Sequence, residues 1–192
     1  MPESEKVLFD SPFITVLHFP WRENQPYTVV RPRTGRGGTV LAIIPPSSEH
    51  PESRILVVSQ DRPPIGGTSW ELPAGGVDEG ETGAQGAARE FSEETGILVR
   101  PEELVDLGMV HANPAFADDQ ISIFAVMLPS DFDTRSLDIQ ADEINDYAWL
   151  PASKALELFI LEPSYSSLIS TALLKANYYG LLDLEFSKKP KL

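Results

Sequence analysis

Three glutamates near the middle of this 192-residue chain are spaced so that they can act together. Glu90, Glu93 and Glu94 stand at i, i+3 and i+4, which places them on one face of a helix. Like charges at this spacing cost about 0.2 to 0.5 kcal/mol per pair, and the helix dipole disfavours carboxylates near a helix C-terminus. A divalent cation would offset both penalties, because hard cations such as Mg²⁺ bind carboxylate oxygens.

The same glutamates have a simpler interpretation as a solvated acidic face. The chain carries 29 acidic and 15 basic residues, which gives a formal net charge of −14. In such an acidic protein an isolated cluster of this kind is usually surface charge. The residues around the cluster decide between the two interpretations.

The segment that carries the glutamates is predicted to be a helix from about Gly83 to Thr95. Thr82 followed three residues later by Gln85 is a capping-box start, and Gly96 is typical of the residue just past a helix end. One narrow face of this helix is small and mostly apolar, and it is expected to pack against the rest of the domain. That face consists of Ala84, Ala87, Ala88, Phe91 and Thr95.

Residues in and around this helix match a longer pattern, G-x5-E-x7-R-E-U-x-E-E-x-G-U, where U is a bulky apolar residue. The matching residues are Gly75, Glu81, Arg89, Glu90, Phe91, Glu93, Glu94, Gly96 and Ile97. The pattern is the Nudix box, complete at every specified position. The chain therefore resembles the Nudix hydrolases, which cleave nucleoside diphosphates linked to another moiety. The resemblance implies an α/β fold, the Nudix α/β/α sandwich with a mixed central sheet.

Carried over to this sequence, the resemblance assigns metal binding to Glu90 and Glu94. Glu93 would share a second ion, and the carbonyl of Ala74 would complete the site. The expected ion is Mg²⁺, with Mn²⁺ as the alternative, because a ligand set made only of oxygens suits these hard cations.

Arg89 and Gly75 have supporting roles by the same resemblance. Arg89 would orient the carboxylates through its planar guanidinium, with Glu81 as its partner. The alternative for Arg89 is a plain i, i+4 surface pair with Glu93. Gly75 and Gly76 let the backbone come close to the cations and the diphosphate, so Gly75 is expected to contribute to substrate binding.

The stretch before the box resembles the ADP-ribose pyrophosphatase branch of the family. W-E-L-P-A-G-G leads into the box, and a Q-x-R follows an apolar strand. Relatives that hydrolyse nucleoside triphosphates usually read P-G-G where this chain reads Pro73-Ala74-Gly75. Arg62 and Glu71, which these two matches cover, are expected to bind substrate.

Pro114 and Trp21 are two further candidates for substrate binding. Pro114 lies seventeen positions after Ile97, where a proline marks the same branch. Trp21 and Tyr27 are either aromatics of a core or dimer interface, or a platform on which a nucleobase stacks.

The general base is expected from the acidic segment between Asp131 and Asp146, where the resemblance places a mobile loop. Glu143 is the first choice, with Asp142, Asp138 and Glu93 behind it. The alternative for Glu143 is a solvated loop acid without a catalytic role.

Apolar runs and turn residues predict the elements around the box. Strands or extended segments are expected at residues 13–19, 27–31, 39–44, 54–59, 70–73, 104–111, 120–128 and 147–150. Two C-terminal helices are expected at residues 152–159 and 164–179, and residues 60–69 are expected to form a loop. Residues 1–35 are interpreted as an N-terminal strand extension that mediates dimerisation, followed by the Nudix domain at residues 36–192.

Composition excludes several classes of site and partner. The chain has no cysteine, so it has no disulfide, thiolate nucleophile or zinc–thiolate site. The acidic balance argues against nucleic acid and anionic membranes as partners, and no apolar run reaches the roughly 18 residues of a membrane span. A cytoplasmic location is expected.

The predicted function is metal-dependent hydrolysis of ADP-ribose or a related nucleoside diphosphate sugar, yielding a nucleoside monophosphate and a sugar phosphate. The alternatives are a Nudix pyrophosphatase for a nucleoside triphosphate or dinucleoside polyphosphate, and a non-catalytic domain that senses a nucleotide sugar. The expected assembly is a homodimer.

Overall fold

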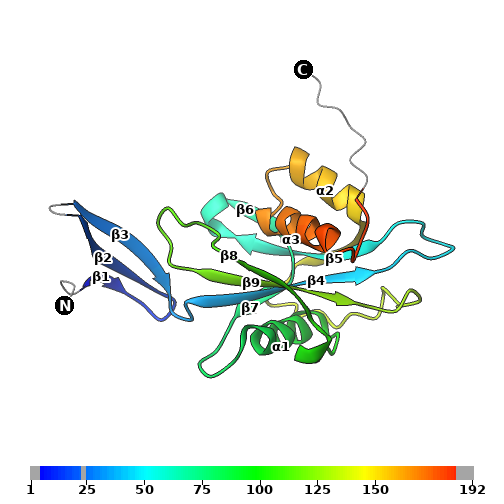
Figure 1. The fold of residues 1–192 in the computed structure, drawn as a ribbon, viewed down its shortest axis with the longest axis horizontal. Coiled ribbons are helices and arrows are strands. Elements are labelled where there is room, and N and C mark those ends of the chain that lie inside the picture. Colours follow the sequence, from blue (N-terminus) through cyan, green and yellow to red (C-terminus); the bar gives the residue numbers. More distant parts are fainter. Residues whose placement is uncertain (1–4, 23–24, 185–192) are drawn as a thin grey trace, which may run out of the picture.

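The computed structural model describes residues 5–22 and 25–184 of the chain. A central sheet lies between α1 (Gly83–Thr95) on one face and the pair α2 (Ala152–Leu161) and α3 (Ser167–Tyr178) on the other (Figure 1). This arrangement confirms the predicted α/β/α sandwich. None of the helices in the described ranges is long and apolar enough to cross a membrane, and the cytoplasmic location stays a prediction.

The central sheet is mixed, as expected. Its main path runs β10-β5-β4-β9-β8, with β6 paired to β5 and β7 paired to β4. The β4–β9 pair is parallel and the other pairs are antiparallel. The strands are β4 (Arg36–Ile44), β5 (Arg54–Arg62), β6 (Gly67–Glu71), β7 (Ala74–Gly76), β8 (Val105–Val110), β9 (Gln120–Met127) and β10 (Asp146–Pro151).

The helices cover both faces of β4 and β5, which explains why these two strands are almost continuously apolar. Odd-numbered residues such as Leu41 and Ile55 face α2 and α3, and even-numbered residues such as Val40 and Leu56 face α1. Phe91 of α1 is fully buried in the second of these two cores. Side-chain alternation along the strands therefore fixes which face α1 covers.

Residues at the N-terminus form a separate three-stranded antiparallel sheet of β1 (Lys6–Asp10), β2 (Ile14–Arg22) and β3 (Gln25–Pro32). This sheet extends from one end of the body (Figure 1). The strands β2 and β3 were predicted, whereas β1 was not. A parallel bridge between Val30 and Ala117 connects the sheet to the loop between β8 and β9.

The predicted loop at residues 60–69 was wrong for most of its length. The strand β5 continues to Arg62, a short 3₁₀ turn spans Pro63–Ile65, and β6 begins at Gly67. Polar residues such as Gln60 weaken the apolar pattern, but Gln60 pairs with Ser69 across the β5–β6 ladder and both are buried. The cause is partly tertiary, because the buried side chain of Gln60 hydrogen-bonds to Glu94, which lies 34 residues away, as well as to nearby Arg62. A second 3₁₀ turn spans Pro101–Glu103.

Candidate functional site

The helix that carries the box begins and ends where its sequence predicts. The Thr82 side chain accepts a hydrogen bond from the Gln85 N–H at 3.2 Å, and the Gln85 side chain accepts one from the Thr82 N–H at 2.8 Å. Gly96, at φ 71°, closes the helix in the left-handed conformation. Most of the predicted packing face is buried, with Ala84 partly so.

The three glutamates of α1 differ in exposure although they stand at helical spacing. Glu94 is only 2% exposed, whereas the side chain of Glu90 is 21% exposed and that of Glu93 is 55% exposed. Glu94 follows Phe91 by three positions and therefore lies beside the buried face of the helix. The three glutamates share one face of α1, as the spacing predicts, and this face runs from the core at Glu94 to solvent at Glu93.

The carboxylate of Glu94 contacts the segment just before the box. Its Oε2 accepts a hydrogen bond from the Ala74 N–H at 3.0 Å, and its Oε1 accepts one from Gln60 Nε2 at 3.2 Å. The pKa of Glu94 is raised to about 7, mainly by burial. The negative charges of Glu90 and Glu143 also raise this pKa, whereas the hydrogen bonds from Ala74 and Gln60 lower it. The fold therefore holds a buried carboxylate at an electrostatic cost.

The carboxylate of Glu90 lies against Gly75. A Cβ atom placed on Gly75 would lie 2.1 Å from Cδ of Glu90, so only glycine leaves room for this carboxylate. Gly75 belongs to β7, which pairs with β4 through Gly38. Glu94 thus reaches the backbone of Ala74, and Glu90 lies against the adjacent Gly75.

Arg89 connects most of the remaining carboxylates of the box. Its Nε and Nη2 donate to the two oxygens of Glu81, each at 3.1 Å. Its Nη1 donates to Glu90 at 2.8 Å and to Glu93 at 3.2 Å. Its Nη2 also donates to the carbonyl of Gly76 at 2.9 Å. The hydrogen bond to Glu81, followed by that to Glu90, raises the pKa of Arg89. The surface pair with Glu93 exists, but it is one contact among several.

The donor set around Ala74 and Gly75 fits a hard divalent cation. It consists of carboxylate and backbone oxygens, and it includes a buried carboxylate whose ionised form would be stabilised by a nearby positive charge. Within the described ranges, no set of three or more His, Cys, Asp or Glu side chains is arranged to hold a metal ion as it stands. Arg89 instead supplies the positive charge to Glu90 and Glu93.

Arg62 and Glu71 form a bidentate ion pair next to this site. Arg62 donates to the two oxygens of Glu71 at 2.8 and 2.9 Å, and it also donates to the side-chain oxygen of Gln60. Gln60 in turn contacts Glu94. Sequence reasoning missed Gln60 as a site residue, although it is the first residue of the Q-x-R match.

The acidic loop passes along the end of α1. The Gln140 N–H donates to the carbonyl of Glu94 at 3.2 Å, and the Asp138 N–H donates to the carbonyl of Thr95 at 3.1 Å. Glu143 is exposed, and its charge contributes to the raised pKa values of both Glu94 and Arg62. The fold therefore brings Glu143 into electrostatic range of the box and of Arg62.

A family model described as the NUDIX domain matches residues 36–171 of the chain. The chain belongs to the Nudix family. This result confirms the family resemblance that the box indicated.

Curated relatives match this Nudix chain over shorter stretches. An octanoyltransferase from Myxococcus xanthus is 38% identical over 114 residues, which cover 56% of this chain and 29% of that protein. An ADP-ribose pyrophosphatase from Bacillus subtilis (strain 168) is 36% identical over 73 residues, which cover 38% of each protein. The chain thus spans well under half the length of these two relatives.

A solved structure has a similar fold. The MutT/nudix family protein from Enterococcus faecalis superposes with a TM-score of 0.50 at 18% sequence identity, covering 60% of this chain and 43% of the other. The similarity supports the Nudix fold assigned to the body of this chain.

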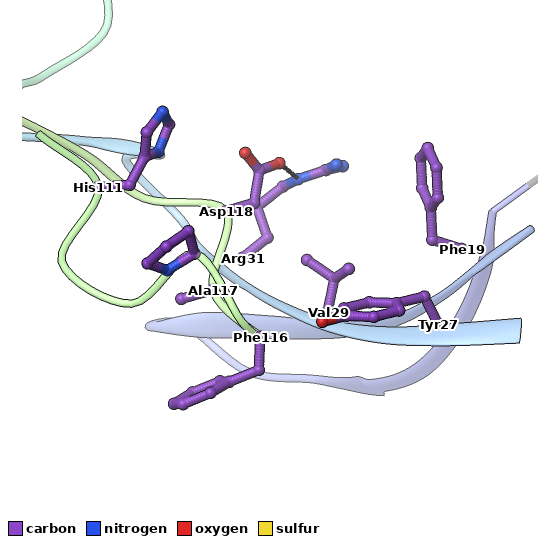
Figure 2. Close-up of a pocket in the computed structure, with 9 residues that line it drawn as sticks. Phe19, Tyr27, Val29, Arg31, His111, Phe116, Ala117 and Asp118 are labelled. Atoms are coloured by element: carbon purple, nitrogen blue, oxygen red, sulfur yellow. Dashed lines mark hydrogen bonds and ion pairs between the residues drawn. The ribbon is translucent and has the colours of Figure 1, made fainter. Parts of the chain in front are cut away.

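Two predicted substrate-binding residues lie away from the Nudix box in the chain. Pro114 belongs to the loop between β8 and β9 and lines a cavity of about 550 Å³ against the N-terminal sheet. Figure 2 labels the other residues that line this cavity. The same cavity is lined by Phe19, Tyr27, Val29, Arg31, His111, Phe116, Ala117 and Asp118. Trp21 lies near the end of β2, and its side chain is outside the described part of the structure.

Hydrogen bonds attach the loop between β8 and β9 to the N-terminal sheet. The Tyr27 hydroxyl donates to the carbonyl of Ala115. Arg31 forms an ion pair with Asp118 at 2.8 Å (Figure 2). The Val30 N–H donates to the carbonyl of Phe116 at 2.7 Å. Strand β3 therefore positions the loop that carries Pro114.

Proposed function

We propose that this Nudix domain hydrolyses the diphosphate linkage of ADP-ribose or a related nucleoside diphosphate sugar. The products are a nucleoside monophosphate and a sugar phosphate. The observation that carries the proposal is the approach of Glu90 and Glu94 to the backbone of Ala74 and Gly75, beside the Arg62–Glu71 pair.

The chemistry requires positive charge and a positioned water. A diphosphate resists attack because its oxygens are negatively charged, and Mg²⁺ or Mn²⁺, when bound, neutralises that charge and activates water. Glu90, Glu94 and the carbonyl of Ala74 would hold one ion, and Glu93 would share a second. Glu143 accepts the proton of the attacking water in this proposal, with Glu93, Asp138 and Asp142 as alternatives.

Arg89 orients the carboxylates of this site in the proposal. It holds Glu90 and Glu93 while its other nitrogens bind Glu81 and Gly76. Because one planar guanidinium connects β7, the start of the box and α1, the carboxylates are placed before any ion arrives.

Substrate recognition is assigned to two regions. Arg62 and Glu71 bind the substrate next to the box, and Gly75 allows the diphosphate to approach the backbone. The nucleobase is assigned to the cavity lined by Tyr27 and Pro114, whose apolar walls suit a planar ring. Trp21 is the further candidate for base stacking.

The N-terminal sheet is assigned to contact with a second copy of the chain. Val7, Leu8, Phe9 and Phe13 are between 45% and 80% exposed, which leaves an apolar surface on β1 and the turn that follows. Burial of such a surface favours association. A homodimer would cover it.

Replacement of Glu94 by Gln tests the proposed function. We expect E94Q to lose metal-dependent turnover of ADP-ribose while it remains folded, because the amide keeps the shape of the side chain but cannot supply a charged ligand. Turnover is measured as phosphate release in a phosphatase-coupled assay with Mg²⁺. Retained turnover in E94Q would contradict the assignment.

A substrate panel separates the proposal from its alternatives. The panel contains ADP-ribose, GDP-mannose, a nucleoside triphosphate and a dinucleoside polyphosphate, each assayed with Mg²⁺. Preference for the nucleotide sugars supports the proposal, and preference for another class refutes the substrate assignment. Binding of ADP-ribose without turnover would indicate a sensor, which the complete box argues against.

A further inference from the structure

Gln60 lies between two groups of charged residues and contacts both. Its side chain is buried, with the residue 6% exposed. Its Oε1 accepts a hydrogen bond from Arg62, and its Nε2 donates to Glu94 at 3.2 Å. Since Arg62 is held by Glu71 at 2.8 and 2.9 Å, hydrogen bonds run without interruption from Glu71 to Glu94.

The direction of these hydrogen bonds follows from the chemistry of Arg62. A guanidinium donates only, so the amide oxygen of Gln60 must face Arg62 and its NH₂ must face Glu94. The second oxygen of Glu94 accepts the Ala74 N–H at 3.0 Å. Each oxygen of Glu94 therefore has one donor from the protein, which fixes the carboxylate plane and leaves further lone pairs for a cation.

We propose that Gln60 is a positioning residue that holds the Glu94 carboxylate in the orientation in which it binds the divalent cation. This inference rests on the proposed function, in which Glu94 is a metal ligand. Gln60 acts through Glu94, because a residue behind a metal ligand orients that ligand and tunes its affinity. Gln60 also makes the metal site and the Arg62–Glu71 pair one hydrogen-bonded unit.

The test replaces Gln60 by Met, which is unbranched and of similar length but cannot form either hydrogen bond. We expect Q60M to bind Mn²⁺ about tenfold more weakly than the wild type, or weaker still. Binding is measured on the full chain without substrate, by titrating Mn²⁺ and following the free ion by electron paramagnetic resonance. We also expect Q60M to need more Mg²⁺ for turnover, with recovery at saturating Mg²⁺.

Two further variants separate positioning from simple loss of structure. S69A changes the buried residue paired with Gln60 across β5 and β6, and it is expected to bind Mn²⁺ like the wild type. R62M keeps Gln60 but removes the group that orients its amide, so its Mn²⁺ affinity should fall by less than that of Q60M. Circular dichroism and the thermal midpoint check that each variant is folded. If Q60M does not fold, the Mn²⁺ affinity of R62M serves as the test.

The outcomes distinguish failure of this inference from failure of the proposed function. Mn²⁺ binding that is lost in E94Q but unchanged in Q60M and R62M would overturn the positioning role alone. A wild-type chain that does not bind Mn²⁺, or an E94Q variant that binds it like the wild type, would overturn the proposed function and this inference with it. A weakened affinity in folded Q60M, with S69A unchanged, supports the inference.

Discussion

Burial gives Glu94 of α1 an electrostatic cost in the folded protein. It is 2% exposed, and burial is the main cause that raises its pKa to about 7. Glu93, one position earlier, is exposed and paired with Arg89. The same residue type thus serves in two environments within one helical turn.

The raised pKa of Glu94 predicts how stability depends on pH without metal. From about pH 4.5 to about pH 7 the folded state keeps a proton that the unfolded state has lost, so the free energy of unfolding falls as pH rises. The shift of the Glu94 pKa from 4.5 to about 7 corresponds to a decrease of about 3 kcal/mol in the free energy of unfolding. This decrease is complete above about pH 7. Urea unfolding in EDTA at several pH values measures it.

The difference in stability between E94Q and the wild type isolates this contribution. That difference should grow in favour of E94Q as pH rises through the same window, and added Mg²⁺ should reduce it by stabilising the ionised carboxylate. E79Q removes one charge from an exposed glutamate before α1 and is the control. A pH-independent difference would contradict the prediction.

Gly75 is predicted to be required for the position of the Glu90 carboxylate rather than for stability. The Cβ of G75A would meet the end of a flexible side chain, which can move away. We expect the free energy of unfolding to change by less than about 1 kcal/mol, while metal-dependent turnover falls about tenfold or more.

The matched control for G75A is G67A, because a Cβ at Gly67 has no other atom within 4 Å. This variant should preserve both turnover and stability. Turnover of G75A equal to that of G67A would show that the Glu90 carboxylate does not need its observed position.

At the scale of elements, α1 is held to the sheet by close packing on β4. A Cβ on Gly38 of β4 would lie 2.7 Å from the Cβ of Ala87 in α1. The small face predicted from the helix pattern therefore lets the helix approach the strand closely, and this approach brings Glu94 to Ala74.

G38A is predicted to destabilise the fold by about 1 to 3 kcal/mol through overpacking. Removing the opposing methyl group should relieve the closest contact, although the Cα and N of residue 87 remain at 3.1 and 3.2 Å. The double variant G38A/A87G should therefore lose less stability than the sum of the two single variants. Urea unfolding of all four proteins in the cycle measures the coupling. Additive losses would show that the clash is absorbed elsewhere.

At the scale of the whole molecule, the N-terminal sheet is joined to the body mainly through β3 and the loop after β8. The outer strand β1 leaves Val7 and Phe9 more than half exposed. This surface is the one assigned above, as a proposal, to contact with a second copy. The sheet also forms one wall of the cavity that Pro114 lines.

Association through β1 predicts that the wild type is a dimer at micromolar concentration and that V7D/F9D is a monomer. Light scattering coupled to size exclusion gives the mass in solution. I160D introduces a charge at an exposed isoleucine of α2 and should leave the dimer intact. A monomeric wild type would refute the prediction.

The sequence by itself determined the helix, its two ends and the family. These features are local, because the capping residues, the apolar face and the box all lie between Gly75 and Ile97, and spacing along one helix sets them. The apolar runs also indicated most strands of the central sheet. They did not predict β1, and they ended β5 too early. The polar residues of these strands adopt regular strand structure through pairing with neighbouring strands.

Only the tertiary structure decided how the site residues differ in burial and in the contacts they make. Spacing places three glutamates on a helix, but the sheet beneath α1 decides that Glu94 is buried and Glu93 is exposed. Gln60 meets Glu94 from a position 34 residues earlier in the chain, and β3 holds the loop of Pro114. These contacts join segments far apart in sequence, and burial and pKa depend on such contacts rather than on local pattern.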